Sequence, residues 1–285
     1  MSLFFVFIIL VTWIFSRALG NPSILYGGVI FALVMNIFSY WNSDKVVIKM
    51  SGAKPIDKAT HRELFNIVEN LTIATGLPMP KLYIINDHAP NAFATGRDPE
   101  HSAIAVTSGL LERLDRSELE GVLAHELSHI KNRDILVSTI AVVLVGFIAI
   151  VSDMFLRHMF FFGNNNDRER GGDARLQLIF FVVGIIMAIL APIAASLIQL
   201  AISRKREYLA DASGALMTRY PDGLANALRK ISSYQGELKK ASHATAHLYI
   251  ANPFREKGFR KALGQFFMTH PPIEERIKAL EDMGK

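Results

Sequence analysis

The chain has 285 residues, 51% of them hydrophobic, a formal net charge of +5 and no cysteine. The lack of cysteine excludes disulfides, a thiol nucleophile and cysteine-rich structural zinc sites. The hydrophobic share exceeds that of an ordinary soluble domain. The positive charge is not accompanied by an aromatic-basic pattern typical of nucleic-acid binding, and basic flanks of membrane segments are its commoner cause. We therefore expect a membrane protein with no nucleic-acid partner.

Two apolar stretches open the chain, Leu3–Phe15 and Ile24–Tyr40, and a Gly-Asn-Pro turn separates them. A membrane-spanning helix needs about 20 apolar residues, so the first stretch must extend to include a snorkelling Arg17. It has no positively charged region before it and no small-residue cleavage site after it, which is unlike a signal peptide. We therefore expect residues 1–42 to form a retained transmembrane hairpin.

Residues 43–134 form the first polar region, and a helix is predicted near its start. Thr60 and Glu63 have the spacing of a capping box, which satisfies free backbone N–H groups at a helix start. Apolar residues then recur at helical spacing from Leu64 to Leu71. The pattern therefore predicts an amphipathic helix with one buried face.

Two short runs of strand-forming residues, Lys81–Ile85 and Ala103–Val106, enclose the small-residue stretch N-A-F-A-T-G. This stretch is either an ordinary strand or turn of an α+β fold, or an edge strand beside a metal-binding helix. In the second case it would pair with the backbone of a peptide substrate by strand addition. The candidate residues for that pairing are Asn91, Ala92, Phe93 and Ala94.

The segment Leu123–Ile130 reads L-A-H-E-L-S-H-I and carries the strongest chemical signal in the chain. On a helix, His125 and His129 lie one turn apart and therefore share one face. Two neutral imidazoles at this spacing can bind one zinc ion, at about 2 Å each. Zinc lowers the pKa of a bound water to about 7, and Glu126 is placed to take the proton of that water.

The residues around this motif predict the helix that it needs. Ser117 and Glu120 have capping-box spacing, and Asp115 and Glu118 add negative charge where the helix dipole favours it. Apolar residues then recur at helical steps and predict a buried stripe. The members of this stripe are Leu119, Val122, Leu123, Leu127 and Ile130.

Two further apolar stretches follow the motif, Ile135–Ser152 and Leu176–Ser203. Their lengths predict a second transmembrane hairpin over residues 135–203. Its connector, residues 157–175, carries no motif that indicates a function. Basic residues are more frequent at the membrane ends beside the polar regions than at the opposite ends, which predicts that the polar regions face the cytoplasm.

Residues 204–285 form the second polar region. Glu207, soon after the fourth apolar stretch, is the best candidate for the third protein ligand of a catalytic zinc. Asp211 lies one turn further on the same face, where it can accept a hydrogen bond from a ligating histidine. Asp134, shortly after His129, is a lesser candidate for the same role. The alternative for Glu207 and Asp211 is an exposed acidic face, or carboxylates that balance Arg204, Lys205 and Arg206, and the alternative for Asp134 is a solvent-facing role.

The end of the chain is predicted to be mostly helical and offers candidates for stabilising a reaction intermediate. His270, held before two prolines, and Arg276 can each hydrogen-bond the oxyanion of a tetrahedral intermediate. Packing and a surface salt bridge are the alternative roles. His243 and His247 also lie one helical turn apart, but without a glutamate after the first they are secondary ligand candidates. The predicted helices are Lys205–Met217, Gly223–Ser232 and Ile273–Met283.

Four motifs occur in order around the apolar stretches: N-A-F-A-T-G, H-E-L-S-H-I-K-N-R-D, E-Y-x-A-D and T-H-P-P-I-E-E-R-I. With them the chain resembles the HtpX family of bacterial membrane zinc metalloproteases, which is related to the CAAX prenyl endopeptidases. The resemblance implies a mainly α fold with four transmembrane helices and an α+β, gluzincin-like catalytic domain built from residues 43–134 and 204–285. The site residues that it implies are His125, His129 and Glu207, as ligands of one zinc ion, and Glu126, as the base.

The resemblance also implies a multi-pass protein of the bacterial inner membrane whose catalytic domain faces the cytoplasm. Its expected substrates are damaged or misassembled membrane proteins. Two other functions compete: a non-catalytic membrane scaffold or chaperone clamped by zinc, and an intramembrane protease. An intact Glu126 and only three protein ligands disfavour the scaffold, because structural zinc usually has four. Charged residues on both sides of the histidine motif disfavour the intramembrane protease.

Overall fold

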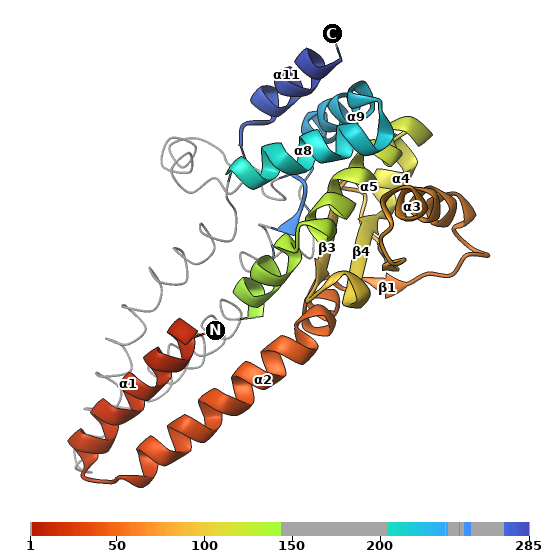
Figure 1. The fold of residues 1–285 in the computed structure, drawn as a ribbon. Coiled ribbons are helices and arrows are strands. Elements are labelled where there is room, and N and C mark those ends of the chain that lie inside the picture. Colours follow the sequence, from red (N-terminus) through yellow and green to blue (C-terminus); the bar gives the residue numbers. More distant parts are fainter. Residues whose placement is uncertain are drawn as a thin grey trace, which may run out of the picture. The chain divides into compact units, whose positions relative to one another are not determined.

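The computed structural model describes residues 2–143, 204–236, 238, 245, 248–251 and 271–284. The chain divides into two compact units (Figure 1). One unit comprises Met1–Trp41 and Val143–Leu197, and the other comprises Asn42–Val142 and Ile198–Lys285. The described residues are mainly helical, with one small sheet in the second unit.

The chain opens with two helices, α1 (Ser2–Leu19) and α2 (Ser23–Ser51). They cover the first two predicted apolar stretches, and Gly20 turns the chain between them with a φ of 64°. Within the described residues, α2 is the one helix whose length and composition would allow it to cross a membrane. It continues past the predicted end at Tyr40 because no glycine or proline interrupts it before Gly52.

Of the second predicted hairpin, the structure describes only the first part. The helix Asp134–Val143 is apolar and begins the third predicted stretch. The rest of that stretch, the connector 157–175 and the fourth stretch, Leu176–Ser203, lie outside the described residues. The predicted number of four transmembrane helices therefore stays a prediction.

The sheet of the second unit has the strand order β1-β2-β4-β3. Strand β1 pairs antiparallel with β2, β2 pairs parallel with β4, and β3 pairs antiparallel with β4. The predicted strand Lys81–Ile85 is confirmed, and the strand predicted over Ala103–Val106 is one residue longer at each end. The strand bounds are β1 Lys54–Pro55, β2 Lys81–Ile85, β3 Ala92–Gly96 and β4 Ser102–Thr107.

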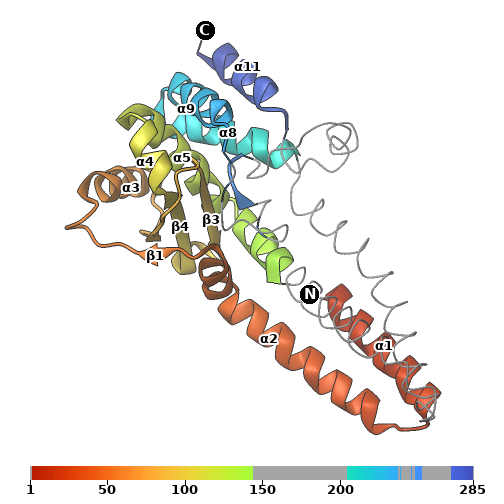
Figure 2. The same ribbon diagram turned by 180° about the vertical axis from the view of Figure 1, so that it is seen from behind.

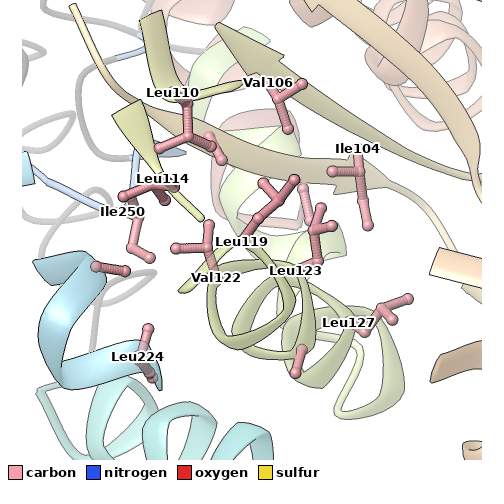
Figure 3. Packing of buried hydrophobic residues seen from close by; sticks show 14 of the residues in the cluster. Ile104, Val106, Leu110, Leu114, Leu119, Val122, Leu123, Leu127, Leu224 and Ile250 are labelled. Atoms are coloured by element: carbon pink, nitrogen blue, oxygen red, sulfur yellow. The ribbon is translucent and has the colours of Figure 1, made fainter. Parts of the chain in front are cut away.

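Side chains on both faces of the sheet are buried, and successive residues belong to different clusters. In β4, Ile104 and Val106 join the large cluster that contains the apolar stripe of the histidine helix (Figure 3). Ala105, between them, belongs to a second cluster with Phe93 of β3 and Tyr249. A strand places alternate side chains on opposite faces, so a strand buried on both faces has apolar side chains at successive positions, here from Ala103 to Val106.

The helix that carries the histidine motif, α5 (Arg116–Lys131), lies between the sheet and a pair of helices, α8 and α9 (Figures 1 and 2). It contacts β3 on one side and α8 and α9 on the other, so most of its residues are buried. The final predicted helix is confirmed with the same bounds. The other helices of this unit are α3 Arg62–Thr75, α4 Ser108–Arg113, α8 Arg204–Thr218, α9 Pro221–Ser233 and α11 Ile273–Met283.

The capping box predicted for α5 is wrong by two residues. Asp115, not Ser117, is the N-cap: its carboxylate accepts from the backbone N–H of Glu118 at 2.9 Å. The Glu118 carboxylate accepts in return from the Asp115 N–H at 2.9 Å and also binds Lys230 of α9 at 2.6 Å. Because Glu118 is buried and paired in this way, the helix begins earlier than the Ser117–Glu120 spacing predicts.

The capping box predicted for α3 is also wrong. The N-cap is His61, which makes no side-chain cap hydrogen bond. The Thr60 hydroxyl instead donates to the Asp57 carboxylate at 2.8 Å, so it belongs to the preceding turn. The helix ends at Gly76, whose left-handed conformation, with a φ of 69°, suits glycine.

Two glycines allow the helices to approach α5 closely. A Cβ on Gly121 would lie 2.6 Å from the backbone nitrogen of Leu224 in α9, and one on Gly214 of α8 would lie 3.0 Å from the backbone nitrogen of His125. Backbone atoms cannot move aside without shifting a whole helix. These contacts therefore set the positions of α8 and α9 relative to the histidines.

Gly121→Ala is expected to destabilise the protein by about 1–3 kcal/mol, the usual cost of forcing an extra methyl group into a packed core. Unfolding of the purified protein by denaturant or heat measures the effect. Gly27→Ala in α2 is the matched control, because its Cβ would meet no atom of the described residues within 4 Å. Equal stability of the Gly121 variant and the control would contradict the packing of α9 on α5.

Candidate metal centre

Three side chains from two helices converge at one point. In α5, His125 and His129 place their Nε2 atoms 3.2 Å apart. From α8, the carboxylate of Glu207 lies 3.5 Å from Nε2 of His129 and 3.9 Å from Nε2 of His125. One donor atom from each residue lies within 4.8 Å of the other two, and this group could hold a metal ion.

The separations match what zinc requires. Two ligands at 2.0–2.1 Å from one ion at tetrahedral angles lie about 3.3 Å apart. The two Nε2 atoms are 3.2 Å apart, and the nearer carboxylate oxygen is 3.5 Å from one of them. His125 and Glu207 are buried, so their donor atoms are held in place by packing. Two imidazoles and one carboxylate are also the donor set of many catalytic zinc sites.

The other ring nitrogen of His125 faces a buried carboxylate. Its Nδ1 lies 2.9 Å from Oδ1 of Asp211 in α8. The guanidinium of Arg276 in α11 donates to both oxygens of Asp211, at 2.7 and 2.8 Å, and to the backbone oxygen of Ile250 at 3.0 Å. Burial opposes ionisation of Asp211, but Arg276 outweighs it and lowers the pKa of the carboxyl to about 2. Burial lowers the pKa of His125, so this imidazole stays neutral.

His129 has a similar partner on its Nδ1. Oδ2 of Asp134 lies 3.2 Å from that nitrogen, and Nη1 of Arg206 lies 3.3 Å from Oδ1 of the same carboxylate. Burial acts to lower the pKa of His129, but the carboxylates of Asp134, Glu207 and Glu126 together raise it to about 9. In the metal-free protein His129 therefore carries a proton that a metal ion must displace.

Glu126 lies beside the convergence point and is 1% exposed. Burial raises the pKa of its carboxyl to about 7, and the nearby Glu207 adds to the rise. The backbone N–H of Ala94 in β3 acts in the opposite direction by hydrogen bonding to the carboxylate. A carboxyl group with a pKa near neutrality can both accept and release a proton at physiological pH.

The stretch N-A-F-A-T-G forms β3, which lies at one edge of the sheet next to α5. Part of its outer edge is already hydrogen bonded within the chain. The backbone oxygen of Ala92 accepts from the N–H of Ile250 at 3.0 Å, and the N–H of Gly96 donates to the hydroxyl of Thr139 at 3.2 Å. The side chain of Asn91 donates to the backbone oxygen of Ala251 at 3.0 Å.

The structure thus brings together most of the candidate residues, from α5, α8, α11, β3 and the helix Asp134–Val143, and these residues all lie within one unit. Arg276 is fully buried, and its guanidinium donates to Asp211. This structural role explains the residue without any contact to substrate. Sequence reasoning missed Arg206 as a partner of Asp134; its place directly before Glu207 was the one signal for it. No sequence pattern indicated that Ile250 and Thr139 would hydrogen bond to β3. The candidates outside the described residues are His243, His247 and His270.

Known proteins are similar to this chain in sequence and in fold. The sequence profile of Peptidase family M48 matches residues 58–284. A "Protease HtpX homolog" of Tropheryma whipplei is 48% identical over 285 residues, covering 96% of this chain and 94% of that protein. One of Lactobacillus acidophilus is 50% identical over 262 residues, covering 91% and 85%. The crystal structure of S. mikatae Ste24p has a TM-score of 0.53 at 19% identity and covers 95% of this chain and 61% of that chain, which shows a shared fold.

Proposed function

Because this chain belongs to peptidase family M48 and is a metalloprotease, we propose that it is a zinc-dependent endopeptidase whose metal is held by His125, His129 and Glu207. The observation that carries this proposal is the convergence of two Nε2 atoms and one carboxylate within 4.8 Å. Both Nδ1 atoms face carboxylates, so the Nε2 lone pairs remain available for the metal.

The proposed reaction is hydrolysis of a peptide bond. One zinc ion per chain would supply Lewis acidity, which lowers the pKa of the attacking water. Glu126 accepts the proton of that water and then passes it to the nitrogen of the leaving amine. The raised pKa of Glu126 suits both steps, since the group must hold the proton briefly and then release it.

The residues around the ligands have proposed supporting roles. Asp211 and Asp134 fix the ring orientation of the two histidines through carboxylate oxygens that lie 2.9 and 3.2 Å from their Nδ1 atoms. Arg276 keeps Asp211 ionised, and its full burial favours this role over contact with an oxyanion. His270 stays the candidate for stabilising the oxyanion.

The proposed substrates are polypeptides, bound in part by strand addition to β3. The outer edge of this strand adjoins α5, which carries Glu126. Pairing at Ala92, Ala94 or Gly96 would compete with the bonds that these residues make to Ile250, Glu126 and Thr139, so a substrate strand would have to displace those partners. Within this class we propose damaged or misassembled membrane proteins, because the chain has a helix able to cross a membrane.

We further propose a multi-pass protein of the bacterial inner membrane with four membrane segments. The apolar composition of the stretches 135–152 and 176–203 supports the third and fourth segments, of which the structure describes only the part up to Val143. The excess of basic residues beside the polar regions supports a catalytic domain in the cytoplasm.

Chelation provides the direct test of the proposed function. The purified full chain in detergent should cleave an unfolded model protein, lose that activity with a zinc chelator and regain it when zinc is restored. A membrane scaffold or chaperone clamped by zinc would bind the ion but leave the substrate uncut. Zinc-loaded protein that shows no cleavage would therefore favour the scaffold, and cleavage that resists full removal of zinc would contradict the proposed metal.

Cysteine labelling tests the proposed orientation, because the chain has no cysteine of its own. Lys54 is exposed in β1, so Lys54→Cys should resist a membrane-impermeant maleimide in intact cells and react after lysis. Asn165→Cys, in the connector, is the matched control and should react in intact cells. The reverse pattern would place the catalytic domain outside the cytoplasm.

A further inference from the structure

We propose that Arg206 is a positioning residue of the metal centre, which acts through Asp134 on His129. The inference rests on the proposed zinc site and adds Arg206, which contacts Asp134, to the residues that support that site. It follows from the contacts of Asp134, from the position of Arg206 in α8 and from a comparison with the partner of His125.

The carboxylate of Asp134 is shared between two groups. One oxygen, Oδ2, lies 3.2 Å from Nδ1 of His129, and the other, Oδ1, lies 3.3 Å from Nη1 of Arg206. The side chain of Asp134 is 11% exposed and that of Arg206 is 41% exposed. The arginine is therefore the more exposed of the two partners, and its contact with Oδ1 helps to hold the carboxylate beside Nδ1 of His129.

Arg206 and Glu207 are consecutive residues in the first turn of α8, and they act on opposite sides of one ring. The Glu207 carboxylate lies 3.5 Å from Nε2 of His129, while Arg206 reaches the Nδ1 side through Asp134. The ion pair thus fixes the start of α8 against Asp134, the first residue of the helix that comes after α5. Since Glu207 is the next residue, the same contact sets its distance from the histidines.

The Nδ1 side of His125 is supported by the same pair of residue types, an aspartate and an arginine. There Asp211 lies between Nδ1 and Arg276, whose guanidinium binds both carboxylate oxygens and is fully buried. Removing Arg276 would leave a buried unpaired carboxylate and is expected to unfold the protein. Arg206 is partly exposed, and an exposed ion pair contributes little to stability, so its effect on the metal can be measured in a folded protein.

Two effects of Arg206 on zinc binding oppose each other. Its positive charge repels a bound cation, but solvent screens that repulsion and the Asp134 carboxylate lies between them. Its bond to Asp134 keeps the carboxylate on Nδ1 of His129, which fixes the tautomer with Nε2 free and raises the basicity of that nitrogen. We expect the orientation of Asp134 and His129 to outweigh the charge repulsion, because the orientation acts through direct contacts.

The test compares zinc affinity of the purified full chain by competition with a chromogenic chelator. Losing a direct hydrogen-bond partner of a ligand typically costs about 10–100-fold in metal affinity, so Arg206→Gln, one contact further away, should cost roughly 3–10-fold. Arg206→Lys should retain most of the affinity. Lys205→Gln, an exposed neighbour in the same turn that loses the same charge, should match wild type. Arg206→Gln should have no further effect in an Asp134→Asn background.

The outcomes separate this inference from the zinc site itself. Wild-type affinity of Arg206→Gln, or an equal loss in Lys205→Gln, would overturn the positioning role while leaving the zinc site intact. If Arg206→Gln lowered the zinc affinity equally in the wild-type and Asp134→Asn backgrounds, Arg206 would not act through Asp134. Failure of the wild-type protein to bind zinc would overturn both proposals. A purely structural role would lower the unfolding temperature of Arg206→Gln without changing its zinc affinity.

Discussion

Glu126→Gln is expected to abolish most peptide cleavage while leaving zinc binding and the fold unchanged. The amide has nearly the shape of the carboxylate, so the buried position beside His125 is filled as before. It cannot accept the proton of the attacking water, however, and general acid–base catalysis contributes about 10²–10⁴-fold to the rate. Cleavage of an unfolded model protein and zinc stoichiometry, measured on the same preparation, check both parts of the expectation.

A control on the same helix makes the Glu126 result specific. Glu120→Gln removes an equal charge from α5 at a partly exposed position away from the three donors, and it should cleave at the wild-type rate. Full activity of Glu126→Gln would contradict the assignment of Glu126 as the general base. Loss of zinc from the same variant would instead show that the carboxylate contributes to metal binding.

Glu207→Gln is expected to lose both zinc and activity. The group that could hold the metal consists of two imidazoles and this one carboxylate, and without the carboxylate two neutral ligands would hold a dication with no charge compensation. The loss of affinity should exceed the roughly 10–100-fold that follows from losing a hydrogen-bond partner of a ligand. Zinc stoichiometry of the purified protein after dialysis measures it directly.

The two glutamine variants together distinguish the two carboxylates of the site. Glu126→Gln should keep the metal and lose activity, whereas Glu207→Gln should lose both. Near-full zinc occupancy in Glu207→Gln would move the third ligand elsewhere. His270 would then be the first alternative, and His243 or His247 the next.

Local sequence patterns were sufficient for most elements near the site. The strand Lys81–Ile85 and the helix Ile273–Met283 have their predicted bounds, because periodicity and flanking prolines or polar residues act over a few neighbours. The spacing of His125 and His129 also predicted that they would share a helix face, and their Nε2 atoms are 3.2 Å apart. Each of these features depends on residues within one or two turns of each other.

Helix starts were less predictable, because several polar residues compete for one cap. Ser117 and Thr60 both had capping-box spacing to a glutamate. Burial of Glu118 against Lys230 of α9 selected Asp115 instead, and the turn formed with Asp57 occupied Thr60. The deciding contact for α5 comes from a helix distant in sequence.

The sequence by itself determined which residues can bind a metal and that the two histidines share one helix face. Only the tertiary structure decided which arginine neutralises each aspartate and which backbone groups occupy the edge of β3. Arg206 reaches Asp134, and Arg276 reaches Asp211 and Ile250, because α8 packs on α5 and α11 packs on α8 and α9. That arrangement follows from burying the apolar faces of helices far apart in the chain, and hydrophobic burial has no preferred direction or pairing that a local pattern can encode.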